Sequence, residues 1–163
     1  MSGAREILDA ARGELAAADA PREGLGRRAV PGRILRRAPR IERVGSAWRL
    51  GVLLLADDGR TLAVGDVLRA AEEVRRGFAA ESARQRAAER AAAVRGGFQL
   101  GEIVHVDWHE IDLEAVAAGA ASGPLSVLNG TVLVAWSAAG APMPLAPYVR
   151  ERVALLLDPP AGA

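Results

Sequence analysis

Apolar residues recur at helical spacing at the start, in the middle and at the end of the chain. In residues 5–18 they lie three or four positions apart with charged residues on the opposite face, which predicts an N-terminal helix. Residues 79–94 are rich in alanine and carry a stripe of small side chains. They predict a central helix that packs on another helix or on its copy in a second subunit, and that ends at Gly96. Pro147 is placed to begin a C-terminal helix, which Pro159 ends.

Two β-hairpins are predicted where a short turn signal separates two apolar runs. Gly59 and Gly130 follow an aspartate and an asparagine, and glycine readily adopts the positive φ that such turns need. The predicted strand pairs are 48–55 with 61–67, and 125–128 with 131–136. Three successive leucines at 53–55 indicate a central strand that is covered on both faces.

The remaining segments complete an α+β pattern. Residues 33–44 are compatible with an edge strand, residues 102–111 predict a further strand, and the prolines and glycines of residues 20–31 predict an extended or looped segment. Asp112 is placed to cap a short helical turn. We therefore expect a single α+β domain over residues 1–163, with a mainly antiparallel sheet built from hairpins and with N-terminal, central alanine-rich and C-terminal helices.

Composition excludes several chemistries. The chain has no cysteine, which rules out disulfides, thiol nucleophiles and thiolate metal sites, and all 21 basic residues are arginine, which rules out a lysine Schiff base or a P-loop lysine. The longest apolar run, residues 50–56, is far shorter than the roughly 20 residues of a spanning helix. Charges near the N-terminus interrupt any signal-peptide core, so we expect a cytoplasmic protein that does not enter a membrane.

A net charge of +1 conceals a strong asymmetry along the chain. Residues 22–49 hold nine arginines and two glutamates, whereas residues 96–163 hold two arginines and seven acids. The basic block could bind phosphate or nucleic acid. The candidate residues are Arg27, Arg28, Arg33, Arg36 and Arg37. Pairing of the two blocks on folding or dimerisation explains the charges equally well, and a single aromatic residue in the basic block, Trp48, disfavours nucleic acid.

His105, Asp107 and His109 would project from one face of an extended strand, since side chains alternate with a period of two. Imidazole and carboxylate are ligands for zinc, nickel or iron, so the three residues are a candidate metal site. The outer two Cα atoms would be roughly 13 Å apart on a flat strand, which favours adjacent pairs over a full triplet. The alternative is the solvated polar face of an antiparallel strand.

A second set of candidates is a run of carboxylates, which could support acid–base chemistry or Mg²⁺ binding. They are Asp107, Glu110, Asp112 and Glu114. Capping of the helical turn by Asp112 is the simpler interpretation, because a carboxylate accepts hydrogen bonds from free N–H groups at a helix start. No serine lies in a Gly-x-Ser-x-Gly turn.

Four stretches together resemble a known group of proteins. They are residues 21–28, 43–45, 48–55 and 148–160. They are similar to a family of small uncharacterised proteins from high-GC bacteria, some of which are labelled glutaminase. Serine-dependent glutaminases use a Ser-x-x-Lys pair in a larger fold, and this chain contains no lysine. The resemblance therefore implies a family without implying glutaminase chemistry.

Taken together, these patterns predict a small cytoplasmic binding protein, forming a homodimer, with no catalytic machinery and no cofactor. The small-residue stripe of residues 79–94 and the opposed charge blocks suit a symmetric interface. Two alternatives remain open. One is a metal-dependent hydrolase or metal-binding protein that uses His105, Asp107 and His109, and the other is an arginine-rich phosphate or nucleic-acid binder.

Overall fold

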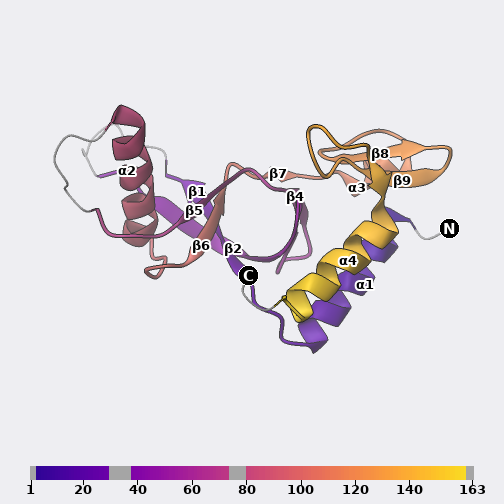
Figure 1. The fold of residues 1–163 in the computed structure, drawn as a ribbon, viewed down its shortest axis with the longest axis horizontal. Coiled ribbons are helices and arrows are strands. Elements are labelled where there is room, and N and C mark those ends of the chain that lie inside the picture. Colours follow the sequence, from indigo (N-terminus) through magenta and orange to yellow (C-terminus); the bar gives the residue numbers. More distant parts are fainter. Residues whose placement is uncertain (1–2, 30–37, 74–79, 161–163) are drawn as a thin grey trace. The chain divides into compact units, whose positions relative to one another are not determined.

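The computed structural model describes residues 3–29, 38–73 and 80–160 and has an α+β fold, as the sequence predicts (Figure 1). The helices are α1 (Ala4–Ala17), α2 (Glu81–Arg95), α3 (Leu113–Ala117) and α4 (Leu145–Leu157). The first strands are β1 (Glu23–Arg28), β2 (Ile41–Leu50), β3 (Leu53–Ala56), β4 (Thr61–Ala63) and β5 (Asp66–Arg69). The others are β6 (Ile103–Val106), β7 (His109–Glu110), β8 (Leu125–Leu128), β9 (Thr131–Val134) and β10 (Met143–Pro144).

Within the described residues the strands form two sheets. The larger has seven strands hydrogen-bonded in the order β5-β6-β1-β2-β3-β4-β7, and the smaller has the order β10-β9-β8. β1 and β6 pair in parallel, whereas β5 with β6, β2 with β3, β3 with β4, and β4 with β7 are antiparallel. The mainly antiparallel sheet of the prediction is confirmed.

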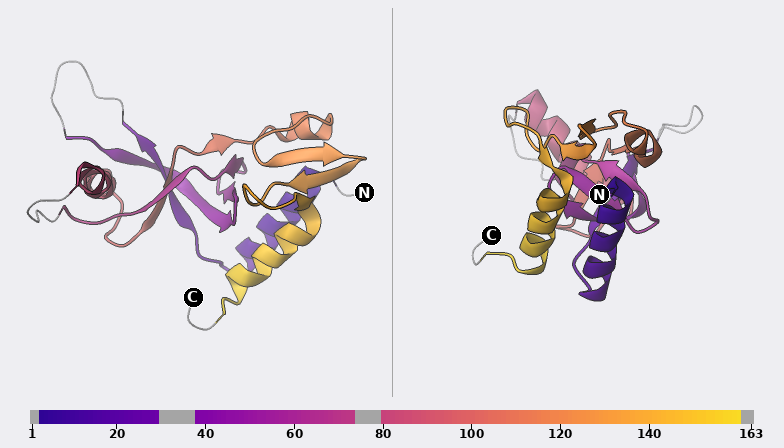
Figure 2. Two further views of the ribbon diagram at one scale, coloured as in Figure 1. Left: turned by 45° about the horizontal axis from the view of Figure 1, so that its top comes forward. Right: turned by 90° about the vertical axis from the view of Figure 1, so that its right-hand side faces the viewer.

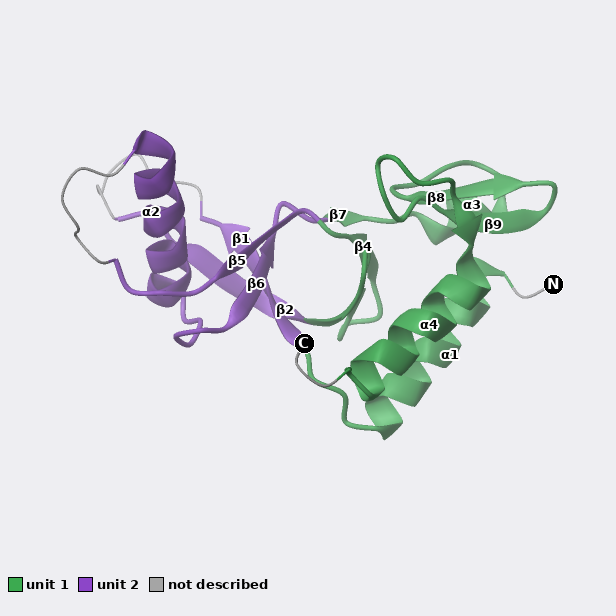
Figure 3. Cartoon of the chain, in the orientation of Figure 1, with its two compact units in different colours: residues 1–22, 47–64, 109–163 green, residues 23–46, 65–108 purple. Residues whose placement is uncertain are grey.

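The chain folds into two compact units, each made of segments that are distant in sequence (Figure 3). Unit 1 comprises residues 1–22, 47–64 and 109–163, and unit 2 comprises residues 23–46 and 65–108. Strand β2 contributes its first part to unit 2 and its last part to unit 1.

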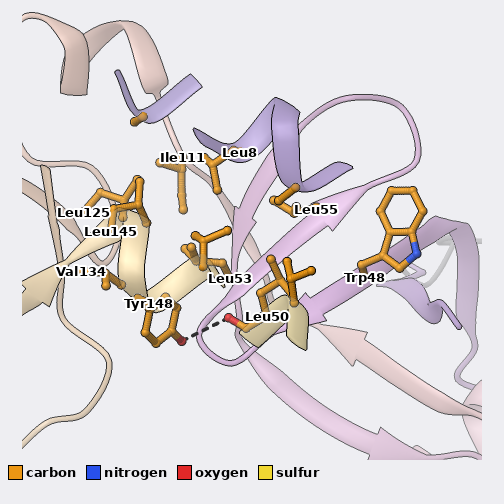
Figure 4. Close-up of a cluster of buried hydrophobic side chains, with 14 of the residues drawn as sticks. Leu8, Trp48, Leu50, Leu53, Leu55, Ile111, Leu125, Val134, Leu145 and Tyr148 are labelled. Carbon is orange, nitrogen blue, oxygen red and sulfur yellow. Dashed lines mark hydrogen bonds between the residues drawn. The ribbon is translucent and has the colours of Figure 1, made fainter. Parts of the chain in front are cut away.

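Unit 1 is built around one apolar core, drawn in Figure 4. α1 and α4 lie side by side, as the two views of Figure 2 show. The Tyr148 side chain of α4 is buried, and its hydroxyl donates to the Leu50 carbonyl oxygen at 3.1 Å and accepts from the Val52 amide at 2.9 Å. The hydroxyl therefore links the backbone on the two sides of the turn between β2 and β3.

The two predicted turns of unit 1 are present, but the first predicted strand is divided. β3 and β4 form the hairpin around residues 57–59, and β8 and β9 form the second hairpin, with Asn129 at φ 49° and Gly130 at φ 75°. The predicted continuous strand 48–55 was wrong, because the chain turns at Gly51, whose φ is 62°. Leu53, Leu54 and Leu55 are all fully buried, as their apolar run predicted.

The remaining helices of unit 1 follow the sequence closely. Asp112 caps α3 by accepting from the Glu114 and Ala115 amides at 3.0 and 2.9 Å, which confirms the predicted cap. α4 begins at Leu145, two residues before the predicted start, so Pro147 is its third residue. Proline is tolerated there because the first helical N–H groups have no partner within the helix.

Unit 2 consists of the β5-β6-β1-β2 part of the sheet with α2 against one face. Ala92 and Ala93 of α2 are buried against side chains of the sheet, among them Ile41 and Val104. The last turn of α2 therefore packs on strands and not on another helix of the described chain, while its packing on a copy in a second subunit stays a prediction. The predicted end at Gly96 is correct.

Strand β1 lies within the segment predicted to be extended or looped, and the structure has its extended form. A Cβ added at Gly24 would lie 2.5 Å from the Phe98 ring, and one at Gly26 would lie 2.5 Å from Ile41 Cγ2. These glycines therefore serve close packing of the α2-facing side of the strand, and do not break it.

In the part of the chain that the structure describes, no helix is both long enough and apolar enough to cross a membrane.

Candidate interaction surface

The predicted metal residues do not lie on one continuous strand. β6 ends at Val106, Asp107 has a positive φ of 53°, and β7 begins at His109, so the predicted strand 102–111 is broken at its centre. A residue with positive φ interrupts the alternation on which the shared face depended.

His105 is fully buried and does not lie on a solvated face as the alternative interpretation expected. Its Nε2 contacts the Glu23 carboxylate, and its Nδ1 has no hydrogen-bond partner. If the proton is on Nε2, Nε2 donates to Glu23 and Nδ1 carries a lone pair. A buried lone pair without a donor costs less than a buried N–H without an acceptor. Within unit 2 this pair joins β6 to β1.

The other two predicted ligands have different surroundings. The Asp107 carboxylate accepts from Arg28 Nη2 at 3.1 Å, and His109 is exposed on β7 opposite Ala63. Across residues 3–29, 38–73 and 80–160, no three His, Asp or Glu side chains are grouped so that they could hold a metal ion.

The predicted carboxylate run is also occupied by local partners. Asp112 caps α3, Glu114 accepts from Arg5 at 2.6 Å, and Glu110 lies 3.9 Å from Arg60. These contacts are the ordinary ion pairs and caps of a surface strand followed by a helix.

The predicted phosphate-binding arginines separate to the two faces of β1. Arg28, on the face toward α2, donates to Asp107 and to Glu89 at 2.8 Å, and lies 4.0 Å from Asp66. The hydrogen bond to Asp107 is the main cause of a raised pKa for Arg28. Arg27, on the other face, lies over the Trp108 ring with 6.0 Å to its centroid. The remaining candidates Arg33, Arg36 and Arg37 lie outside the described residues.

The structure brings together a different set of arginines, around a hollow of about 510 Å³ within unit 2. The hollow, which we call the β5 groove, is lined by all four residues of β5, by Ile103 of β6, and by Arg86, Glu89 and Arg90 of α2. All four residues of β5 line the hollow, so it borders that strand along its whole length.

In the part of the chain that the structure describes, β5 is the end strand of the sheet, and it pairs with β6, with Val67 opposite His105 and Arg69 opposite Ile103. Among the described residues no other strand pairs with it. An unpaired edge presents a row of backbone donors and acceptors that can bind an extended chain.

The charges of the groove are unevenly neutralised. Its carboxylates, Asp66 and Glu89, are both within reach of Arg28, which contacts them from β1. Arg86 and Arg90 are exposed and lie four positions apart on α2, so like charges occupy one face of the helix. Arg69 extends from β5, where Nη1 donates to the Gly101 carbonyl oxygen at 3.1 Å. The two acids of the groove therefore pair with Arg28, and they do not neutralise the three arginines that line the groove, Arg69, Arg86 and Arg90.

The sequence did not mark these arginines as a cluster. They come from a block at residues 69–95 with seven arginines and four glutamates, whose net charge is smaller than that of the block at 22–49. The spacing of Arg86 and Arg90 was an available signal, but only the fold brings Arg69 to the same hollow.

Comparisons with known proteins add no assignment. A scan of protein-family models and searches of curated proteins and of solved structures found no match to this chain.

Proposed function

We propose that this protein is a non-catalytic interaction module that binds an extended, acidic polypeptide segment in the β5 groove. The observation that carries the proposal is the position of Arg69, Arg86 and Arg90 around one hollow beside β5, whose outer edge pairs with no strand among the described residues. It develops the binding function predicted from the sequence, and we place that function in the cytoplasm.

Two interactions, backbone pairing and ionic hydrogen bonds, favour binding of an acidic polypeptide over binding of other ligands. A peptide that adds a strand to β5 satisfies the backbone groups of the edge, which a compact anion does not. Arginine forms directed, charge-assisted hydrogen bonds to carboxylates, so acidic side chains beside Arg86 and Arg90 gain more than neutral ones. The half-exposed Val67, with 41% of its surface accessible, adds an apolar contact at the centre of the edge.

Anisotropy of a fluorescein-labelled peptide that alternates Glu and Val tests the proposal, with the same peptide carrying Lys in place of Glu as control. We expect saturable binding of the acidic peptide only, weakened by added salt because exposed charges are screened. The double variant R86A/R90A should bind about tenfold more weakly, since two charge-assisted contacts are lost.

Arg84→Ala is the matched control variant. Arg84 lies on the same helix and is exposed, but it pairs with Glu81 at 3.0 Å and does not line the groove. Unchanged binding in this variant separates a groove effect from a change in net charge. Equal weakening in R84A and R86A/R90A would contradict the proposal.

Two other occupants are outcomes of the same test. A single-stranded oligonucleotide that binds more tightly than the acidic peptide would replace this proposal with phosphate binding. The homodimer predicted from sequence could occupy the same edge, and light scattering at the assay concentration measures it. A dimer that excludes the acidic peptide would overturn the proposal.

A further inference from the structure

We propose that the β5 groove selects a peptide with two consecutive acidic residues followed by an apolar residue, bound antiparallel to β5. This inference rests on the proposed function and deepens it, because it fixes which peptide position meets which part of the groove.

The backbone pattern determines which residues of β5 offer hydrogen bonds to a partner. The Ala70 amide donates to the Glu102 carbonyl oxygen at 2.9 Å, continuing the register in which Leu68 lies opposite Val104. In an antiparallel ladder, hydrogen-bonded and non-hydrogen-bonded pairs alternate. Ala70 and Leu68 therefore point their backbone groups toward β6, and those of Val67 and Arg69 point toward the open edge.

The side chains of β5 fall on two faces. Leu68 lies opposite Val104 and packs with it in the core under α2, so Leu68 and Asp66 are on the α2 face. Val67 and Arg69 are on the other face, since alternate residues share a face. Residues of an added strand lie on the same face as the residues they oppose.

Each position along the edge therefore has its own preference. The peptide residue opposite Arg69 favours a carboxylate, and the residue opposite Val67 favours an apolar side chain. The intervening residue, opposite Leu68, lies on the α2 face beside Arg86 and Arg90 and also favours a carboxylate. The position opposite Asp66 disfavours an acid, because Asp66 is acidic and exposed.

The direction of the peptide follows from the order of these positions. In antiparallel pairing the peptide meets Arg69 first, then Leu68, then Val67, so its order from the N-terminus is acid, acid, apolar. Parallel pairing reverses this order and is slightly less stable per residue. The groove should therefore distinguish two peptides of identical composition.

The experiment compares two labelled peptides with a Glu-Glu-Val or a Val-Glu-Glu centre between identical Gly and Ser flanks. We expect the first to bind severalfold more tightly, because the reversed peptide keeps its cross-strand pairs only in the less stable parallel orientation. Equal or reversed affinities would refute the selectivity while leaving acidic peptide binding intact. Failure of both peptides to bind would refute the proposed function as well.

A charge exchange tests the register. Arg69→Glu should weaken the Glu-Glu-Val peptide and prefer a peptide with Lys-Glu-Val at its centre, whereas R84E should keep the original preference. Restored binding by the exchanged pair requires contact at this one position. If R69E is unchanged in its preference, the register is wrong.

The backbone contribution has its own variant. Val67→Pro removes the amide that points to the open edge, whereas Val67→Ala keeps it, and thermal unfolding monitors the fold of both. We expect V67P to lose most of the binding that V67A retains. Equal affinity of the two variants would show that the peptide does not pair with β5.

Discussion

Replacing Tyr148 by phenylalanine removes one oxygen atom and keeps the buried ring, so it creates almost no cavity. The lost hydroxyl serves both the Leu50 carbonyl and the Val52 amide across the turn at Gly51. A hydrogen bond contributes about 1 kcal/mol net, and a buried group left without a partner costs about 1–3 kcal/mol. Tyr148 is only 1% exposed, whereas Val52 is half-buried and can regain water in part. We therefore expect a loss of about 2 kcal/mol in the free energy of unfolding.

Urea and thermal unfolding followed by circular dichroism measure this loss. For a chain of this size, about 2 kcal/mol corresponds to a decrease of roughly 4–8 °C in the Tm of the transition that includes unit 1. Ser137→Ala is the control, because the Ser137 hydroxyl accepts from the Gly140 amide at 2.8 Å within its own exposed loop. If the free energy of unfolding of Y148F lies within about 0.5 kcal/mol of the wild-type value, the hydroxyl does not stabilise unit 1 as proposed.

Two further substitutions each test one polar contact, the first in unit 1 and the second in unit 2. Asp112→Ala should cost about 1 kcal/mol of unfolding free energy, because the first amides of α3 lose their acceptor, and Asp112→Asn should recover most of it; urea unfolding of both variants decides. Burial acts to raise the pKa of Glu102, but hydrogen bonds from Arg43 and the Gln99 amide outweigh burial and hold that pKa below its ordinary value. The ionised form therefore stabilises unit 2 above the ordinary carboxyl pKa, and this stability is lost as the pH falls through the folded pKa. Glu102→Gln should be less stable than the wild type at neutral pH, with the difference vanishing in acid, as urea unfolding across pH would measure; a difference independent of pH would contradict this.

The elements that the sequence predicted correctly have local causes. The turn at Gly130 depends on an Asn-Gly pair, the cap at Asp112 depends on a carboxylate before a helix, and the apolar spacing of α1 depends on neighbouring turns. The errors and the open alternatives occurred at residues whose conformation depends on distant contacts. Gly24 and Gly26 left their segment either extended or looped, and they lie in β1 because Phe98 and Ile41 require the space. The candidate metal strand failed at Asp107, whose positive φ no local signal announced.

The same division applies to the candidate site. Sequence alone determined that thiol and lysine chemistry are absent, that arginine supplies every basic side chain, and that the fold is α+β with hairpins. The tertiary structure decided that Arg28 is held by carboxylates and that, among the described residues, β5 is the end strand of the sheet. It also decided that Arg69, Arg86 and Arg90 line one hollow. Turns and caps depend on a few adjacent dihedral angles, so they can be predicted from the sequence. A groove requires pairing between strands tens of residues apart, and the register of that pairing is fixed only when the faces of the sheet are packed.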